Sequence, residues 1–253
     1  MSLSILQITD VHLVGAADGE LCHVNTQHTL ERVLESALET GTPDAIVATG
    51  DIAHDAEAGV YRRFLETVRA RFAGPLLCTP GNHDLWAPMQ LAGLPMDDLD
   101  LGGWMICALD SHLDDHEEAE VADVEVQQLK VRMGDARNVL IVTHHHIEPV
   151  GCPWLDWARI QSPTLLEFAA ENEAVRGVAF GHVHQEVDAC LADRPLFGTP
   201  STCFQFQPRS ERFAMTREAP GWRWLTLEPS GRIRSQVQRV AGLTLNPYIT
   251  QDS

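Results

Sequence analysis

The sequence predicts an α/β protein in which two β-sheets pack face to face and helices cover both outer sides, a four-layer α/β/β/α sandwich. Two observations predict it. Strand-like apolar runs alternate with helical patterns as far as about residue 180, and short strand-like runs without helices follow them. Because no linker rich in Pro, Gly or Ser divides the chain, we expect one domain over residues 1–240 and a C-terminal tail over residues 241–253.

Five apolar runs in the first part of the chain have the character of buried strands. Each run leads into a residue whose side chain can bind a metal ion. The carboxyl ends of strands in a layered α/β sheet are a common place for a site, so we expect these residues to gather there. The predicted strands are Leu3–Thr9, Ala45–Thr49, Leu76–Thr79, Val139–Val142 and Val175–Phe180.

Between these runs the apolar residues follow helical spacing. In the clearest case, Thr26–Thr40, Leu30 and Val33 lie on one face after a candidate N-cap, Asn25. Three further helices are predicted at Ala56–Arg71, Asp123–Met133 and Pro163–Glu171. After residue 180, the runs expected to form the second sheet are Glu186–Leu191, Pro195–Gly198, Cys203–Phe206, Trp222–Leu227 and Arg232–Val240.

Charge and composition argue against several classes of protein. The 253 residues include 36 Asp and Glu against 18 Lys and Arg, a formal net charge of −18. Such a chain is poorly suited to binding nucleic-acid phosphates or an anionic membrane surface. No run approaches the roughly 18 apolar residues of a membrane span, and the N-terminus lacks the pattern of a secretion signal. We therefore expect a cytoplasmic protein that binds neither nucleic acid nor membrane.

Potential metal ligands gather in compact groups along the chain. The groups are Asp10-Val11-His12, Gly50-Asp51, Asn82-His83-Asp84, His144-His145-His146 and His182-Val183-His184. In an extended segment residues i and i+2 point the same way, so a pair such as Asp10 and His12 can face one site. Carboxylate, amide and imidazole ligands without a thiolate suit Mn, Fe or Zn. Their number favours two metal ions over one.

The order of these motifs resembles the signature of the calcineurin-like metallophosphoesterase superfamily: Asp10-x-His12, Gly50-Asp51, Gly81-Asn82-His83-Asp84, His144 and Gly181-His182-x-His184. The resemblance implies two divalent metal ions, iron or manganese before zinc, bridged by Asp51. The ligands that it implies are Asp10, His12 and His184 for one ion, and Asn82, His144 and His182 for the other. His83 is then a catalytic residue beside the leaving group, with Asp84 as its orienting partner.

The run of three consecutive histidines leaves alternatives open. The ligand in this superfamily is usually the first histidine after the strand, which favours His144. Strand alternation turns His145 away from its neighbours, as a buried hydrogen-bonding residue. We expect His146 to contact substrate, together with His83 and Asn82.

Other residues near the motifs carry weaker signals. A loop role is favoured for His54 over a place in the cleft. The charged run Asp110–Glu120 is predicted to be a solvated loop, with a lid or an accessory metal site as the alternative. A place in the core is favoured over a base-stacking surface for four aromatic residues with strand-like alternation, Phe204, Phe206, Trp222 and Trp224.

Missing features narrow the substrate class. Gly50-Asp51 is not followed by the Asp-Arg pair of the protein serine/threonine phosphatases, so an arginine clamp for a phosphomonoester is missing at that position. The two tyrosines, Tyr61 and Tyr248, lie outside every motif, which argues against the purple acid phosphatases with their tyrosine ligand. The acidic chain offers little attraction to the backbone of a nucleic acid. A small phosphodiester is the better substrate.

Segments 144–157, 199–206 and 219–224 extend the resemblance to the bacterial class III cyclic-AMP phosphodiesterases. It implies hydrolysis of 3′,5′-cyclic AMP to 5′-AMP by attack of a metal-bridging hydroxide, with His83 protonating the departing 3′ oxygen. The alternatives are a broader phosphodiesterase acting on 2′,3′-cyclic nucleotides, glycerophosphodiesters or other small phosphodiesters, and a non-catalytic protein-binding scaffold. The expected partner is a small-molecule phosphodiester, and a homodimer is left open.

Overall fold

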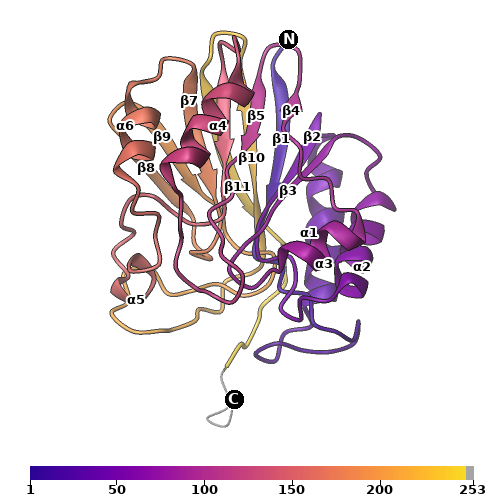
Figure 1. The fold of residues 1–253 in the computed structure, drawn as a ribbon. Helices are drawn as coiled ribbons and strands as arrows, with labels where there is room; N and C mark the ends of the chain where they lie inside the picture. Colours follow the sequence, from indigo (N-terminus) through magenta and orange to yellow (C-terminus); the bar gives the residue numbers. More distant parts are fainter. Residues whose placement is uncertain (249–253) are drawn as a thin grey trace.

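The computed structural model describes residues 1–248, which form two β-sheets stacked face to face (Figure 1). In this part of the chain the first sheet has the strand order β11-β10-β1-β2-β3 and the second the order β4-β5-β6-β7-β9-β8. The strands are β1 (Leu3–Ile8), β2 (Ala45–Thr49), β3 (Leu76–Thr79), β4 (Leu99–Asp100), β5 (Met105–Ala108), β6 (Val139–Val142), β7 (Val175–Phe180), β8 (Val187–Leu191), β9 (Arg194–Gly198), β10 (Gly221–Leu227) and β11 (Ile233–Arg239).

Helices cover the outer side of each sheet (Figure 1). Those beside the first sheet are α1 (Thr26–Thr40), α2 (Ala58–Arg69) and α3 (Trp86–Ala92), and those beside the second are α4 (Asp123–Met133) and α6 (Pro163–Glu171). The short α5 (Pro153–Asp156) lies beyond the end of the second sheet. The Asn25 side chain caps α1 as predicted, since its Oδ1 accepts a 2.6 Å hydrogen bond from the backbone N–H of His28.

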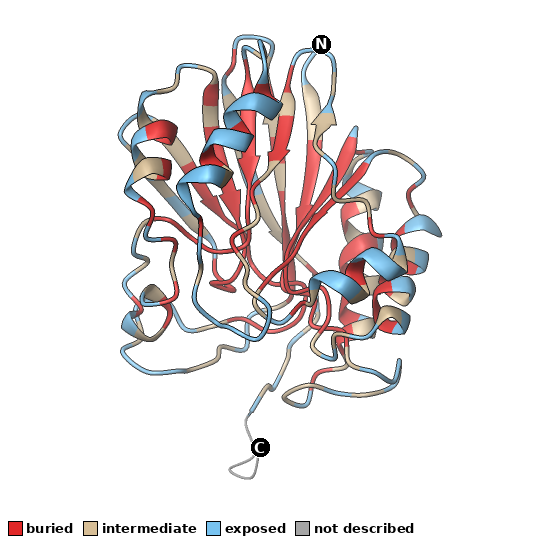
Figure 2. Ribbon diagram, viewed as in Figure 1, coloured by how far each residue is buried: buried red, intermediate tan, exposed pale blue. Residues whose placement is uncertain are grey.

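Three buried apolar layers hold the four structural layers together. Alternation along a strand sends Ile5 into the space between the sheets and its neighbour Leu6 toward α1 and α2. In the second sheet Leu140 faces the first sheet and Ile141 packs with residues of α4 and α6. Figure 2 shows the resulting buried strands, and the buried loops at one end of them. The predicted four-layer α/β/β/α fold is confirmed.

The late strands do not form a sheet of their own, so that expectation was wrong. β8 and β9 extend the second sheet, with β9 parallel to β7, while β10 and β11 extend the first. β10 runs antiparallel to β1, with Trp224 opposite Leu6. This pairing covers the edge of β1 that β2 leaves open, which satisfies backbone groups that would otherwise be unpaired.

The structure also differs from the prediction in its short elements. Cys203–Phe206 is not a strand, because the segment forms only an isolated bridge between Phe206 and Met215. The elements α3, α5, β4 and β5 were not predicted. No helix in residues 1–248 is both long and apolar enough to cross a membrane.

Of the predicted C-terminal tail, residues 241–253, the part from residue 249 onward lies outside the described residues. Its first part is packed against the body of the protein. Leu245 adjoins the apolar cluster of Val24, Cys203 and Phe204, and the Tyr248 ring stacks on another side chain, that of His23, at 3.9 Å between ring centroids.

Candidate metal centre

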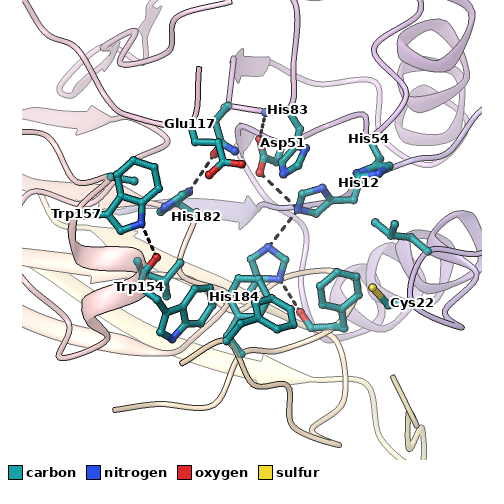
Figure 3. A pocket seen from close by; sticks show the side chains of 17 residues that line it. His12, Cys22, Asp51, His54, His83, Glu117, Trp154, Trp157, His182 and His184 are labelled. Carbon is teal, nitrogen blue, oxygen red and sulfur yellow. Dashed lines mark hydrogen bonds and ion pairs between the residues drawn. The ribbon is translucent and has the colours of Figure 1, made fainter. Parts of the chain in front are cut away.

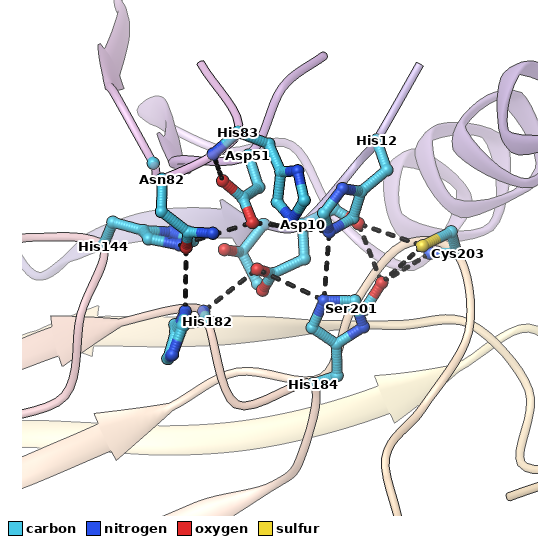
Figure 4. Close-up of polar contacts among 12 residues, drawn as sticks. Asp10, His12, Asp51, Asn82, His83, His144, His182, His184, Ser201 and Cys203 are labelled. Atoms are coloured by element: carbon cyan, nitrogen blue, oxygen red, sulfur yellow. Dashed lines mark hydrogen bonds and ion pairs between the residues drawn. The ribbon is translucent and has the colours of Figure 1, made fainter. Parts of the chain in front are cut away.

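The ends of strands from both sheets meet at one edge of the sandwich, where the predicted ligands converge (Figures 1 and 4). The loops after β1, β2 and β3 come from the first sheet, and those after β6 and β7 from the second. The residues brought together are Asp10, His12, Asp51, Asn82, His144, His182 and His184. The gathering of these side chains at the strand ends agrees with the expectation from sequence.

Most of these residues have a left-handed backbone conformation. The φ angles are 51° at Asp10, 49° at His12, 50° at Asp51, 65° at His182 and 46° at His184. The extended geometry that the sequence argument assumed is therefore wrong, although the pairs still face one site. Left-handed residues other than glycine are uncommon and strained, and such strain concentrates at functional sites.

The first group of side chains consists of Asp10, His12 and His184. The Nε2 atoms of His12 and His184 lie 3.1 Å apart, and Oδ1 of Asp10 lies 3.5 Å from Nε2 of His184. Nδ1 of His184 lies 2.7 Å from the backbone oxygen of Phe204, to which it can only donate. This bond leaves the Nε2 lone pair of His184 directed into the group, as a metal ligand requires.

The second group consists of Asn82, His144 and His182. Oδ1 of Asn82 lies 3.0 Å from Nε2 of His144 and 3.0 Å from Nδ1 of His182. Nδ1 of His144 donates to the backbone oxygen of Thr49 at 2.9 Å, so its Nε2 atom faces the group and can bind an ion once it has lost its proton. The three side chains thus present one oxygen and two nitrogens to a common point (Figure 4).

A single carboxylate joins the two groups. Oδ2 of Asp51 lies 3.4 Å from Nε2 of His12 in the first group and 3.4 Å from Nε2 of His144 in the second. Oδ1 of Asp51 accepts a 2.9 Å hydrogen bond from the backbone N–H of His83. A side chain at Gly81 would collide with both the carboxylate and the backbone nitrogen of Asp51, so this approach requires glycine.

Burial and the neighbouring charges set the protonation of the cluster. Burial opposes ionisation of Asp51, but the imidazoles around it, His144 first, hold the pKa of this carboxyl well below its usual range. Burial would lower the pKa of His144, but the adjoining carboxylate of Asp51 raises it to about 9. Burial lowers the pKa of His184 to about 3, and those of His12 and His182 well below the ordinary value. The neutral imidazoles of His12, His182 and His184 keep the lone pairs that a metal ion needs, whereas His144 would release a proton when an ion binds.

The cluster also contains a buried carboxylate oxygen that suits a cation. Among residues 1–248, Oδ2 of Asp10 has no hydrogen-bond partner, while Oδ1 accepts a 3.0 Å bond from the backbone N–H of His182. Burial raises the pKa of Asp10 to about 8. A buried, incompletely paired carboxylate is costly, and a divalent cation would offset that cost. The oxygen and nitrogen donors of the two groups therefore fit two divalent metal ions.

The side chain of Asp84 does not orient His83, which corrects the expected pairing. Its Oδ2 accepts hydrogen bonds from the backbone N–H groups of Ile52, at 3.1 Å, and Gly81, at 2.9 Å. Its Oδ1 accepts bonds of 3.0 Å each from the N–H of Ala53 and the hydroxyl of Tyr61. Asp84 therefore fixes the loop after β2 to the loop after β3, and so positions the residues that these two loops carry.

The three consecutive histidines have three different surroundings. His145 is buried as expected, with Nδ1 2.9 Å from the Ser111 hydroxyl and Nε2 3.2 Å from the Glu117 backbone oxygen. His146 is also completely buried, and its Nε2 lies 3.2 Å from Oδ1 of Asp156. The substrate contact expected for His146 is therefore not supported. A ring nitrogen of His145 also lies within 4.8 Å of ligand atoms of His144 and His182, but His144 is the one whose Nε2 adjoins both Asn82 and Asp51.

A cavity of about 350 Å³ opens beside the cluster (Figure 3). Its polar side includes His83 and His54, whose ring centroids are 5.2 Å apart, so His54 lines the cleft rather than serving only in a loop. The other side is largely apolar, and its residues Trp154, Trp157 and Phe213 were not singled out from the sequence. Trp154 lies in the short helix α5 and the other two lie in loops, and these segments show no apolar periodicity from which a site could be predicted.

Comparisons with known proteins agree with this geometry. Residues 3–186 match the protein family described as calcineurin-like phosphoesterase. The chain is 36% identical over 253 residues to the 3′,5′-cyclic adenosine monophosphate phosphodiesterase CpdA of Escherichia coli K12, covering 96% of this chain and 92% of that protein. It is also 36% identical over 247 residues to the protein of that name from Pseudomonas aeruginosa, covering 94% and 90% of the two chains.

Solved structures share the fold at much lower identity. A dimetal phosphatase from Danio rerio superposes with a TM-score of 0.61 at 14% identity, covering 94% of this chain and 99% of that one. The protein TT1561 of Thermus thermophilus superposes with a TM-score of 0.63, also at 14% identity, over 95% of this chain and all of its own. With the match over residues 3–186, the chain belongs to the calcineurin-like phosphoesterase family.

Proposed function

We propose that this chain is a dimetal-dependent phosphodiesterase that hydrolyses 3′,5′-cyclic AMP to 5′-AMP. Two metal ions are supported mainly by the position of the Asp51 carboxylate. Its Oδ2 lies 3.4 Å from Nε2 of His12 and 3.4 Å from Nε2 of His144. The substrate is supported by the 36% identity, along nearly the whole chain, to phosphodiesterases named for cyclic AMP.

The proposed ligand sets follow the two groups of side chains. Asp10, His12 and His184 would hold one ion, Asn82, His144 and His182 would hold the other, and Asp51 lies beside both groups. Bound divalent cations supply Lewis acidity at the phosphoryl oxygens and lower the pKa of water near phosphorus. Nitrogen and oxygen donors without a thiolate suit iron or manganese, with zinc as the alternative.

In this proposal the protein's own groups position the substrate and move one proton. His83 is exposed in the cavity wall, so its imidazole can exchange protons with solvent and still reach a bound phosphodiester. Water adds to phosphorus and releases a proton to solvent, and the bond between phosphorus and the 3′ oxygen breaks. His83 gives a proton to that oxygen and takes up another from solvent. His83 and Asn82 both line the cavity and are the proposed substrate contacts at the phosphate.

Product analysis tests this function directly. Manganese-loaded protein is incubated with 3′,5′-cyclic AMP, 2′,3′-cyclic AMP, bis(p-nitrophenyl) phosphate and a phosphomonoester, and the products are separated by chromatography. We expect 5′-AMP from 3′,5′-cyclic AMP, at a higher kcat/KM than for the other three. Turnover of the artificial diester without cleavage of 3′,5′-cyclic AMP would support the dimetal site. It would also show that the natural substrate is another small phosphodiester.

Three further expectations stay predictions. A single catalytic domain over residues 1–240 would survive limited proteolysis as one fragment. The cytoplasmic location is tested by cell fractionation. A homodimer would be detected by light scattering coupled to size-exclusion chromatography.

A further inference from the structure

The cavity beside the metal centre has a wall of aromatic rings that the catalytic chemistry does not use (Figure 3). Two separate segments build this wall. α5 and the residue after it supply Trp154 and Trp157, and the connection between β9 and β10 supplies Phe204, Phe206 and Phe213. Both segments lie beyond the ends of the sheets (Figure 1). Aromatic residues at these positions are therefore not needed for the packing of the two sheets against each other.

The rings pack as a cluster, yet two of them remain open to solvent. Trp154, Phe206 and Phe213 contact one another edge to face, with centroid distances of 5.0, 5.1 and 5.2 Å. Phe213 is nevertheless 43% exposed and Trp157 is 44% exposed. By contrast Trp222, expected in the core from the same alternation, is 2% exposed. The core interpretation is thus right for Trp222, whereas Phe206 is partly buried, packs against the core and also lines the cavity.

Hydrogen bonds hold the Trp157 ring, and the segment that carries both tryptophans, in place before any ligand binds. The indole N–H of Trp157 donates to the backbone oxygen of Trp154 at 2.8 Å. The carboxylate of Asp156, between them in sequence, accepts bonds from the backbone N–H groups of Val150, at 2.8 Å, and Gly151, at 3.1 Å. A ring fixed in this way loses little conformational entropy on binding.

The aromatic wall begins directly at the metal centre. The Phe206 ring stacks on the imidazole of His184, a proposed metal ligand, with 4.1 Å between centroids and 18° between planes. A ligand whose phosphate lies at the metal centre would therefore extend along aromatic faces. The residues that line the cavity, within positions 1–248, include no lysine or arginine. A second phosphate or a polynucleotide would find no cationic partner there. A neutral, planar group could instead stack on the aromatic rings.

We propose that the exposed rings of Trp157 and Phe213, supported by Trp154 and Phe206, form a stacking subsite for the base of a cyclic nucleotide. This inference rests on the proposed function, because it assumes that the phosphate of a nucleotide occupies the metal centre. Stacking on an aromatic ring tolerates any base, since every base has a π-face. The subsite therefore explains how the enzyme binds a nucleoside rather than how it distinguishes adenine from other bases.

Binding of two stable ligands isolates the contribution of the base. Isothermal titration of manganese-loaded protein compares 5′-AMP with ribose 5-phosphate, which lacks the base. We expect wild-type protein to bind 5′-AMP about 5- to 150-fold more tightly, the range for one stacked base. Trp157→Ala should remove most of this ratio, Trp157→Phe should restore part of it, and Phe213→Ala should reduce it. The control Trp86→Ala removes a tryptophan that is 37% exposed outside this cavity, and it should leave the ratio unchanged.

Kinetics separate failure of the subsite from failure of the proposed function. In Trp157→Ala we expect KM for 3′,5′-cyclic AMP to rise about 5- to 150-fold with kcat nearly unchanged. If wild-type protein hydrolyses cyclic AMP but Trp157→Ala and Phe213→Ala keep the full binding ratio, the subsite is wrong and the function stands. If wild-type protein prefers an acyl glycerophosphodiester and loses that preference in Trp157→Ala, the wall binds an acyl chain and the inference is overturned.

Discussion

Replacing His83 with alanine separates the role of its imidazole from the integrity of the metal centre. The imidazole lines the cavity, whereas the backbone N–H of the same residue donates the 2.9 Å bond to Oδ1 of Asp51. His83→Ala keeps this backbone donor, so both metal ions should remain bound. The lost ring packs edge to face with His12 at 4.9 Å. Loss of such a contact costs about 1 kcal/mol, which lowers the melting temperature by about 2–4 °C.

Turnover should respond far more strongly than stability, and in a way that depends on the leaving group. The 3′ oxygen of cyclic AMP departs as a strongly basic alkoxide unless it is protonated, so His83→Ala should lower kcat about 10²- to 10⁴-fold. The p-nitrophenolate of bis(p-nitrophenyl) phosphate needs no proton, and its kcat should fall by less than about 10-fold. His54→Ala, which removes the neighbouring imidazole 5.2 Å away, serves as the matched control and should affect the two substrates alike.

The assay measures kcat for both diesters and the metal content of each variant by mass spectrometry. Equal losses of kcat for cyclic AMP and the nitrophenyl diester would refute the assignment of His83 as the general acid. Loss of metal from His83→Ala would refute the claim that only its backbone supports Asp51.

Two further predictions concern stability and the close approach of the two loops. Burial lowers the pKa of His146 to about 4 and that of His184 to about 3, so below pH 6.5 the unfolded chain binds protons that the folded protein does not. In urea unfolding with chelator present, the free energy of unfolding should therefore decrease as the pH is lowered, by about 2 kcal/mol from pH 7 to pH 5 from His146 alone. His146→Gln should reduce this pH dependence. An unchanged slope in the variant would contradict the prediction. Gly81→Ala should displace Asp51 and weaken metal binding at least 10-fold, and titration with Mn²⁺ showing wild-type affinity would exclude the steric argument.

Strong periodicity and the polar ends of strands allowed the sequence to predict the layers and the cluster. The helix Thr26–Thr40 and the strand Val139–Val142 have the predicted bounds, because the apolar spacing that defines each also buries it. The seven predicted ligands converge because the strand ends of both sheets meet at one edge. The sequence could not reveal which sheet each late strand joins, since β10 pairs with β1 across most of the chain length.

Features that depend on three-dimensional contacts were missed. The alternation of Phe204 and Phe206 suggested a strand, but the segment is shaped by the site, where the Phe204 backbone oxygen accepts a bond from His184. Asp84 is next to His83 in sequence, yet its carboxylate points to backbone donors of another loop. His146 was expected to contact substrate because strand alternation was extended into a turn, where it no longer holds.

The metal stoichiometry of Asp51→Ala tests the bridged dimetal centre most directly. Wild-type protein and the variant are loaded with Mn²⁺, freed of loosely bound ions and analysed by mass spectrometry. Because Oδ2 of Asp51 adjoins both ligand groups, the account predicts two ions per wild-type chain and neither site occupied in the variant. A variant that still holds two ions would contradict the bridging role of Asp51 and, with it, the proposed metal centre.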